Sequence, residues 1–345
     1  MSRLRSLLPA LASLALAAGL LWLALRGADL AEVGRALADG AWGWAVPFVA
    51  VGVLSVVVRA WRWGLLIEAL PERPTAGLRL TTASVFIGYL VNYAAPRLGE
   101  VARAANVARH TDAPFSGVLG TVVAERLLDV VALALALGAV ALVYGDRLAE
   151  VWAAFATGGR ALLDSVPGWA LWAVAALAVA LAGGAAWWLR RGRGGAPGDR
   201  GGVAGLVASF RDGLVSLART GRPLALAAST VALWVCYVAM ADLPLRVLGL
   251  TDAYGLDLVD AGAIMAVGGV GMALPAPGGT GSFHYATVQA MTLLFAVAAT
   301  PAATYAILVH AAGVVLYCAF GVLALVWQGT SLRAVQASAR RAAAS

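Results

Sequence analysis

Long apolar stretches separated by short polar segments restrict the folds open to this chain more than any other feature. Six stretches reach or approach the roughly 20 mostly apolar residues that a helix needs to cross a bilayer. They are residues 7–25, 41–58, 127–144, 168–189, 223–240 and 302–327. Only 12% of the residues are charged, against roughly 25% in a soluble domain. The pattern predicts an all-α polytopic membrane protein and excludes a water-soluble enzyme and a disordered chain.

The first apolar stretch has two interpretations, a membrane helix or a cleaved signal peptide. It follows a basic segment with Arg3 and Arg5, as a signal peptide does. Its apolar run of about 19 residues is longer than the core of a signal peptide, which has about 7–15 residues. We therefore expect a retained membrane helix.

The distribution of charge predicts which loops lie on which side of the membrane. One set of loops carries a net charge of +13: the N-terminus, 59–79, 97–112, 190–222 and the C-terminal tail. The other set carries −5: 26–39, 146–164 and 242–260. Cytoplasmic loops are enriched in arginine and lysine. We therefore expect a multi-pass protein of the cell (inner) membrane with both termini in the cytoplasm.

This orientation requires that three short, polar or broken apolar segments do not cross the membrane. Segment 80–95 must enter from the cytoplasm and return there, and segments 261–274 and 283–299 must enter and return on the outer side. Irregular backbone at membrane depth is tolerated only where protein or a watery cavity surrounds it. The sequence therefore predicts two opposed re-entrant helical hairpins next to a cavity.

The two halves of the predicted membrane domain, about 1–165 and 166–330, have the same order of elements. Each reads span, span, hairpin, span, and the odd number of spans makes the second half inverted relative to the first. Short segments interrupted by glycine or proline at matching places in two inverted halves are typical of a transporter binding site. We therefore expect one membrane domain over residues 1–330 with inverted-repeat architecture.

Two regions are expected on the cytoplasmic side of this domain. Residues 190–222 form a basic loop, and within it residues 203–219 place apolar side chains at helical spacing with arginines between them. This spacing predicts an amphipathic helix on the inner leaflet. Residues 331–345 form a cytoplasmic tail.

The apolar stretch that begins near residue 114 contains the charged residues Glu125, Arg126 and Asp129. On a helix, Glu125 and Asp129 share a face. Ionisable groups in a span are costly and usually face a cavity or one another. Two interpretations remain open. One is a structural ion cluster near the cytoplasmic edge that ties this helix to the first hairpin. In the other, Arg126 contacts a lipid phosphate, while the carboxylates relay a proton or bind a cationic headgroup.

The first hairpin and its exit carry five polar residues: Asn92, Arg97, Glu100, Arg103 and Arg109. Arginine suits phosphate because its planar guanidinium offers two parallel donors. Arg97 lies at the expected turn, directly after a proline, and is a candidate phosphate ligand. Arg103 and Arg109 are also explained as anchors at the cytoplasmic face, and for these two we favour that interpretation.

The second hairpin is expected to turn through a glycine-rich segment. Gly278, Gly279 and Gly281 permit positive φ and close backbone approach, and Ser282 opens the returning half-helix. A glycine turn that opens a helix presents free N–H groups to an anion. His284 and Tyr285 lie in the first turn beyond it. His284 can titrate near neutral pH, although a structural role explains a lone histidine as well.

Arg59, Trp61, Arg62 and Trp63 follow the second predicted span. Basic and aromatic residues anchor helix ends at the membrane interface. We interpret these four residues as interface anchors with no part in a site.

Several classes of function are excluded by missing residue patterns. The sequence has no HExxH, GxSxG or paired-cysteine pattern, so we expect no metal, no cofactor and no hydrolase or redox centre. Cys236 and Cys318 lie in apolar runs and are interpreted as small buried hydrophobic residues. The basic residues number 25 and are all arginine, which excludes a lysine Schiff base. Topology accounts for their excess, so nucleic acid is not an expected partner, and a homodimer stays open.

The order of the motifs resembles that of the lysylphosphatidylglycerol synthase transmembrane family, also called flippase-like domain proteins. The motifs are Asn92 with Pro96-Arg97-Leu98-Gly99-Glu100 and Arg103, then Glu125-Arg126 with Asp129, then Pro277-Gly278-Gly279-Thr280-Gly281. The pair Arg62-Trp63 is similar as well. The resemblance covers nearly the whole chain. It implies an integral-membrane module linked to moving lipids between leaflets, with aminoacylated phosphatidylglycerol or polyprenyl-linked sugars as cargo in family members.

Two departures from the family pattern limit what the resemblance implies. The family often carries a glutamate shortly after its Pro-Gly-Gly motif, where this chain has His284. Full synthases also carry a soluble aminoacyl-transfer domain, and the roughly 18 residues after the last predicted span are too few for one. Synthase activity is therefore not expected of this sequence.

Taken together, these patterns predict a translocase for an anionic or zwitterionic membrane lipid. Arg97 and Arg126 would hold the phosphate, and the carboxylates of the first half would balance them or bind a cationic headgroup. The turn at 278–282 would offer amides from the outer side. Two alternatives remain: an integral-membrane transferase acting on a phospholipid or polyprenyl phosphate, with Glu125 or Asp129 as base, and a coupled transporter of small soluble solutes.

Overall fold

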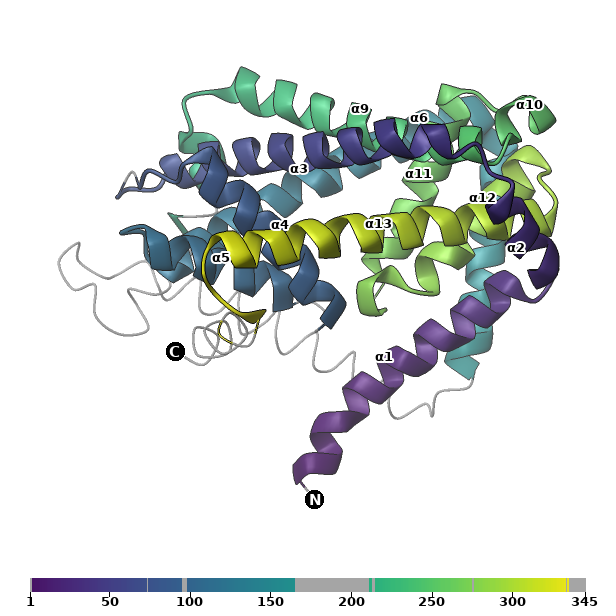
Figure 1. The fold of residues 1–345 in the computed structure, drawn as a ribbon, viewed down its shortest axis with the longest axis horizontal. Coiled ribbons are helices and arrows are strands. Elements are labelled where there is room, and N and C mark those ends of the chain that lie inside the picture. Colours follow the sequence, from purple (N-terminus) through teal and green to yellow (C-terminus); the bar gives the residue numbers. More distant parts are fainter. Residues whose placement is uncertain are drawn as a thin grey trace.

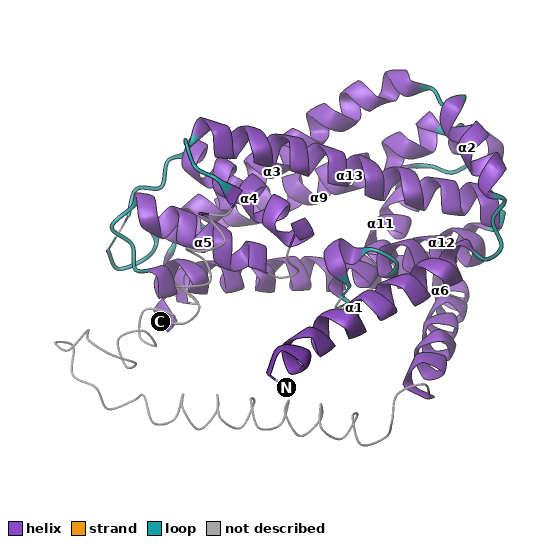
Figure 2. Cartoon of the chain, turned by 60° about the horizontal axis from the view of Figure 1, so that its bottom comes forward, coloured by secondary structure: helices purple, strands orange, loops and turns teal. Residues whose placement is uncertain are grey.

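A computed structural model describes residues 2–72, 74–94, 98–164, 211–212, 215–274, 276–332 and 334 of the chain. These residues form helices joined by turns, and none of them forms a β-strand (Figure 2). The predicted all-α fold is therefore confirmed. The predicted span at 168–189 and residue Arg97 lie outside the described residues. So does most of the predicted basic loop at 190–222, of which residues 211–212 and 215–219 are helical.

Four helices are long and apolar enough to cross a bilayer. They are α3 (Ala45–Glu68) with the short η1 (Trp42–Trp44) before it, α6 (Phe115–Asp164) as far as Gly145, α9 (Pro223–Val247) and α13 (Ala299–Trp327). In Figure 1, α3, α9 and α13 run roughly along the same direction. Their outer faces carry exposed aliphatic residues: Leu142 on α6 is 90% exposed and Leu224 on α9 is 84% exposed. Such faces suit contact with lipid chains rather than water.

A fifth span is formed if two bent helices count as one. Helix α1 (Ser2–Leu25) is followed by α2 (Leu30–Ala38), and the two axes differ by 81°. Asp29 lies between them and caps α2 by accepting hydrogen bonds from the N–H groups of Ala31 and Glu32. The cap satisfies amides that the bend would otherwise leave free. The described residues therefore hold four or five candidate spans.

The helices α4 (Leu78–Ala94) and α5 (Leu98–His110) pack against each other as an antiparallel hairpin, here called hairpin 1. Their backbones touch at Gly88 and Gly99, and a Cβ on Gly99 would overlap the carbonyl oxygen of Gly88. Asn92 Oδ1 accepts a hydrogen bond from the Gly99 N–H at 2.8 Å. Both helices are shorter than the roughly 20 residues of a bilayer span.

The helices α11 (Leu258–Ala273) and α12 (Ser282–Phe295) form a second hairpin, here called hairpin 2. Its turn contains η3 (Pro277–Gly279). Gly278, Gly279 and Gly281 have φ values of 57°, 74° and 82°, a region that only glycine enters readily. Near the turn a Cβ on Gly271 would lie 2.5 Å from the carbonyl oxygen of Ser282. Glycine therefore shapes both the turn and the close approach of the two helices.

The two hairpins extend from opposite ends of the helix bundle (Figure 1), and the turn of hairpin 2 contacts α4 of hairpin 1. Hairpin 1 follows the C-terminal end of α3, whereas hairpin 2 follows α9 and the short α10 (Leu250–Tyr254). The C-terminal end of α9 lies beside the start of α3, because the Ala41 N–H donates to the Val247 carbonyl at 2.8 Å. A Cβ on Gly278 of hairpin 2 would lie 2.8 Å from the ring of Tyr93 in hairpin 1.

Candidate functional site: a buried arginine–carboxylate cluster

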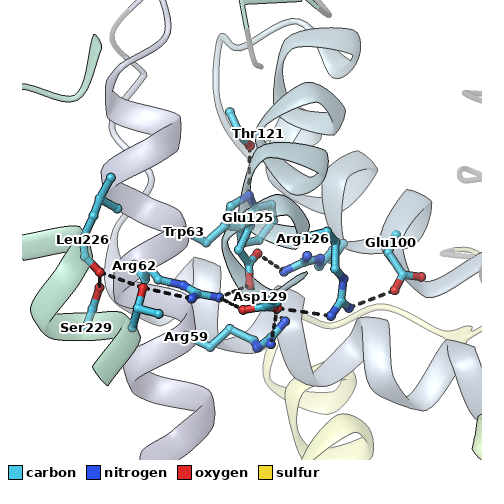
Figure 3. A network of polar contacts seen from close by, with 12 residues as sticks. Arg59, Arg62, Trp63, Glu100, Thr121, Glu125, Arg126, Asp129, Leu226 and Ser229 are labelled. Carbon is cyan, nitrogen blue, oxygen red and sulfur yellow. Dashed lines mark hydrogen bonds and ion pairs between the residues drawn. The ribbon is translucent and has the colours of Figure 1, made fainter. Parts of the chain in front are cut away.

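Seven charged side chains from three helices converge between α3, hairpin 1 and α6 (Figure 3). We call this set the arginine–carboxylate cluster. Its members are Arg59 and Arg62 of α3, Glu100 and Arg103 of α5, and Glu125, Arg126 and Asp129 of α6. Helical spacing of three or four residues puts the two arginines of α3 on one face, and Glu125 and Asp129 on one face of α6.

Glu125 is the centre of the cluster and is fully buried. Its Oε1 lies 2.9 Å from Arg59 Nη1 and 3.2 Å from Arg62 Nη2. Its Oε2 accepts a hydrogen bond from Arg103 Nη1 at 2.8 Å. Three helices are therefore held together through one carboxylate.

Asp129 lies one turn further along α6 and binds the same two arginines of α3. Its Oδ1 accepts a hydrogen bond from Arg62 Nη2 at 2.6 Å, and its Oδ2 accepts one from Arg59 Nη2 at 2.8 Å. Arg126 Nη1 lies 3.5 Å from the same Oδ2. Tyr237 of α9 also accepts a hydrogen bond from Arg59 Nη2, at 2.9 Å, which connects the cluster to a fourth helix.

Arg126 and Glu100 form the outer pair of the cluster. Arg126 Nη2 donates to Glu100 Oε1 at 2.9 Å, and the two side chains are 41% and 29% exposed. Asn92 Nδ2 donates to Glu100 Oε2 at 3.3 Å. Because the ion pairs made by Arg59, Arg62 and Arg103 involve side chains that are at most 17% exposed, this outer pair is the one that a ligand reaches first.

The cluster carries more positive than negative charge. Its four arginines face three carboxylates, a formal net charge of +1. Four buried guanidinium nitrogens have no hydrogen-bond partner among the described residues: Arg59 Nε, Arg59 Nη1, Arg62 Nε and Arg103 Nη2. Arg59 Nη1 still forms an ion pair with Glu125. Four members of the cluster line a small cleft, together with neighbours from α4 and α5: Arg59, Glu100, Arg103 and Arg126 with Val85, Gly88, Tyr89, Asn92 and Gly99. Unpaired cationic donors around a cleft provide the chemistry for binding an anion.

The interpretation of Arg59, Arg62 and Trp63 as interface anchors is wrong. Helix α3 continues ten residues past the predicted end of the span, and all three residues are at most 4% exposed. The Trp63 Nε1–H donates to Thr121 Oγ1 at 2.9 Å, and its ring lies 4.7 Å from the Arg103 guanidinium carbon. The three-residue spacing of Arg59 and Arg62 puts both on one helix face. This spacing is the sequence signal that could have indicated their shared role. Trp61 is 44% exposed, as expected of an anchor.

The anchoring interpretation also fails for Arg103, which is 3% exposed and paired with Glu125. Arg109 instead lies near the end of α5 and donates to Asn106 Oδ1 at 3.0 Å. Helix α6 begins ten residues before Glu125, so its charged residues lie within the helix. The structure thus shows the predicted tie to hairpin 1 and adds a tie to α3 that was not foreseen.

The predicted site residues of hairpin 2 lie apart from this cluster. The Gly279 N–H donates to the Ala276 carbonyl at 3.1 Å, and the Ser282 hydroxyl donates to the Gly279 carbonyl at 3.2 Å. The Gly281 N–H donates to His284 Nδ1 at 3.3 Å. Two of the amides expected to hold phosphate are therefore engaged inside the turn. Tyr285 packs against the apolar cluster around α11 and α13.

Other polar groups of the described residues add little to the site. They contain no group of three or more histidine, cysteine, aspartate or glutamate side chains placed to hold a metal ion. Cys236 is buried, Cys318 is partly buried, and both are free thiols. The net positive charge of the cluster is complementary to an anion.

Fold and site together define a polytopic α-helical membrane protein with a buried, net-positive cluster. The sequence profile of the lysylphosphatidylglycerol synthase transmembrane region matches residues 10–321. The chain therefore belongs to this family. Neither a curated protein nor a solved structure matches the chain.

Proposed function

We propose that this protein moves a phosphate-containing membrane lipid from one leaflet to the other. The proposed cargo is a phospholipid, aminoacylated forms included, or a polyprenyl-phosphate-linked lipid. The observation that carries the proposal is the arginine–carboxylate cluster, whose net charge of +1 lies at a cleft inside an apolar helix bundle. A buried excess charge is costly in such surroundings, and the phosphate of a headgroup would neutralise it.

The proposal includes an inverted repeat, which the contacts between helices support. Each helix of one half has a counterpart in the other: α3 corresponds to α9, α4 to α11, α5 to α12 and α6 to α13. Contacts within one half then have counterparts in the other. The pairs α3–α4, α4–α5, α5–α6 and α4–α13 correspond to α9–α11, α11–α12, α12–α13 and α11–α6. Helices α3 and α9 pack antiparallel on each other, because Ala41 bonds Val247 and Arg62 bonds Thr230.

This pseudo-symmetry supports a membrane arrangement with six spans and two re-entrant hairpins. The sixth span would be residues 168–189, the counterpart of α1. Hairpins 1 and 2 would dip in from the cytoplasmic and outer sides, and both termini would be cytoplasmic. A headgroup would pass between stations at the two hairpins, while its acyl chains stay in lipid. Binding at the interface of inverted repeats is typical of alternating-access transporters.

In the proposed cycle the outer pair of the cluster opens first. A lipid phosphate would displace Glu100 from Arg126, because the planar guanidinium binds phosphate with two parallel donors. The unpartnered nitrogens of Arg59 and Arg103 would then take the remaining oxygens. Where the lipid headgroup carries a positive charge, the freed Glu100 would face it.

The ion pairs of Glu125 and Asp129 argue against the alternative function of a transferase. A general base needs a carboxylate that accepts a proton at the working pH. Glu125 contacts three arginines and Asp129 also contacts three. Nearby positive charges hold both in the ionised, fully engaged form.

The proposal is tested by lipid scrambling in proteoliposomes. Purified protein is reconstituted with a trace of fluorescent phosphatidylglycerol, and dithionite reports the labelled lipid that reaches the outer leaflet. Arg126→Ala should slow the movement about tenfold or more, since charge-assisted hydrogen bonds to phosphate are lost. Arg246→Ala is the matched control, because Arg246 is equally exposed at 41% and also forms an ion pair, with Asp242. This variant should move lipid at the wild-type rate.

Two outcomes would refute the proposal. One is a wild-type protein that moves no labelled lipid while it elutes as a folded, monodisperse species. The other is an unchanged rate in Arg126→Ala. A covalently altered lipid after incubation with the protein would favour the transferase instead.

A further inference from the structure

Four tyrosines connect the arginine–carboxylate cluster with the turn of hairpin 2. They come from three helices: Tyr89 and Tyr93 of α4, Tyr237 of α9 and Tyr317 of α13. Tyr89 and Tyr93 are four residues apart and therefore share one face of α4. Tyr317 lies near enough to the other three tyrosines, and to Arg59, to interact electrostatically with all of them. We call these four residues the tyrosine group.

One end of the tyrosine group contacts the cluster. Tyr89 lines the cleft together with Arg59, and the Tyr237 hydroxyl accepts a hydrogen bond from Arg59 Nη2 at 2.9 Å. Arg59 and Tyr237 have equivalent places in the proposed inverted repeat, because each lies 14 residues after the first residue of its helix, Ala45 or Pro223. Their hydrogen bond therefore joins the two halves where transporters built from inverted repeats bind their cargo.

The other end of the tyrosine group contacts hairpin 2. Tyr93 lies one helical turn beyond Tyr89, and its ring is 2.8 Å from the position that a Cβ on Gly278 would take. The ring of Tyr89 stacks on that of Tyr317, with centroids 4.5 Å apart. The tyrosine group therefore extends from the cleft at hairpin 1 to the turn of hairpin 2, with α13 beside it.

Three hydroxyls of the tyrosine group have no protein partner in the part of the chain that the structure describes. No hydrogen bond joins the hydroxyl of Tyr89, Tyr93 or Tyr317 to a described residue, and all three residues are only partly buried. A polar group inside a membrane protein is costly unless water or a ligand satisfies it. The three hydroxyls can therefore accept a ligand without losing a bond within the protein.

A phenol hydroxyl suits a position through which an anion passes. It donates a hydrogen bond to a phosphate oxygen but carries no charge. Hydrogen bonds from a charged donor such as arginine are about twice as strong as those from a neutral donor. Conduction through a membrane requires sites that bind strongly enough to admit the cargo and weakly enough to release it. Neutral donors next to a charged cluster meet both requirements.

We propose that the tyrosine group forms the route by which a phosphate headgroup leaves the arginine–carboxylate cluster and reaches hairpin 2. The phosphate passes from Arg59 to the hydroxyls of Tyr89 and Tyr317. From these it passes to the hydroxyl of Tyr93 beside the turn. This inference rests on the proposed movement of lipid and adds to it residues that lie outside the cluster.

The first test removes hydroxyls and keeps the rings. Tyr93→Phe and Tyr317→Phe should each move fluorescent phosphatidylglycerol about threefold more slowly than wild type, and the double variant about tenfold, because hydrogen bonds to the passing phosphate are lost. Phenyl rings suffice for packing here, since Phe86 stacks on Phe320 between the same two helices. Tyr254→Phe is the matched control: its hydroxyl accepts a backbone N–H at α10, and this variant should keep the wild-type rate.

Equilibrium binding distinguishes the route from the cluster. Tyr93 and Tyr317 lie outside the set of residues that line the cleft, so their phenylalanine variants should bind a short-chain fluorescent phosphatidylglycerol within about twofold of the wild-type affinity. Arg126→Ala should bind the same lipid about tenfold more weakly, because it loses charge-assisted hydrogen bonds. Equal losses of affinity in all three variants would overturn the route, because the tyrosines would then belong to the binding site itself.

A labelling experiment tests the route without lipid movement. In a background with Cys236→Ala and Cys318→Ala, one cysteine is introduced by Tyr93→Cys, Tyr317→Cys or Leu142→Cys. The probe is sulfonatoethyl methanethiosulfonate, an anion whose sulfonate resembles phosphate, added to both sides of proteoliposomes. It should modify the two tyrosine positions. Leu142 is 90% exposed on the outer face of α6, and a cysteine there should stay unmodified because a charged reagent is excluded from hydrocarbon.

The outcomes separate the route from the proposed function. Modification at both tyrosine positions in a protein that moves no lipid would refute the proposed function and leave a polar path for anions through the bundle. Lipid movement at the wild-type rate in both phenylalanine variants and in the double variant would refute the route alone. Cysteines at both tyrosine positions that stay unmodified would also overturn the route, whatever the lipid does.

Discussion

Arg103 Nη1 and Glu125 Oε2 lie 2.8 Å apart and join hairpin 1 to α6 through side chains that are 4% and 0% exposed. Glu125 is held by two further arginines of α3. Breaking a buried ion pair by removing one partner leaves uncompensated charge. The same residues therefore stabilise the bundle and form the inner wall of the proposed lipid site.

Glu125→Ala should destabilise the protein by about 3–5 kcal/mol, because three arginines lose their buried counter-charge. Thermal unfolding in detergent, followed by tryptophan fluorescence, measures the loss. Glu68→Ala is the control: Glu68 is 48% exposed and lies 3.9 Å from Arg222, and an exposed pair contributes about 0–1 kcal/mol. Equal unfolding temperatures for the two variants would contradict the central role of Glu125.

Gly99→Ala should prevent hairpin 1 from closing, because the added methyl group would overlap the Gly88 carbonyl oxygen and the Asn92 side chain. We expect a loss of stability of about 1–3 kcal/mol from this overpacking. Gly138→Ala in α6 places its methyl group in open space and should be neutral or stabilising by about 0.5–1 kcal/mol. Chemical or thermal unfolding in detergent checks both variants, and a tolerated Gly99→Ala would refute the contact.

Trp63→Phe removes a hydrogen bond to Thr121 and weakens the contact with the Arg103 guanidinium. The expected cost is about 1–3 kcal/mol, the sum of one hydrogen bond and one cation–π contact. Trp61→Phe, two residues away and 44% exposed, should change the unfolding temperature little. Similar losses in both variants would indicate that Trp63 serves as an interface anchor after all.

Gly281→Ala should destabilise hairpin 2 for two reasons, the positive φ of 82° and the overlap with the Ala17 carbonyl. Gly329→Ala has only the unfavourable positive φ, of 60°, because no atom lies within 4 Å of the Cβ that the substitution adds. The left-handed conformation alone costs about 1–2 kcal/mol. The unfolding temperature of Gly281→Ala should therefore fall below that of Gly329→Ala, and the reverse order would place the turn away from α1.

The membrane class and most helical elements could be predicted from local sequence alone. Apolar runs of span length, such as 223–240 and 302–327, reappear as α9 and α13, because the length of an apolar helix follows from the bilayer it must cross. The glycine turn of hairpin 2 could also be predicted from the sequence, because Gly278, Gly279 and Gly281 readily adopt positive φ. The family resemblance, drawn from local motifs, agrees with the profile match over residues 10–321.

Which charged side chains contact one another depends on how the helices pack. Arg59 and Arg62 are 63 or more residues from Glu125 and Asp129 in sequence. The sequence near a helix end does not distinguish an arginine that binds lipid headgroups from one that is buried in the bundle. The choice depends on which face α3 turns to α6, and the packing of the whole bundle sets that face. The contact between Gly278 and Tyr93 has the same origin. Charge pairing across helices is a property of packing, which local sequence does not encode.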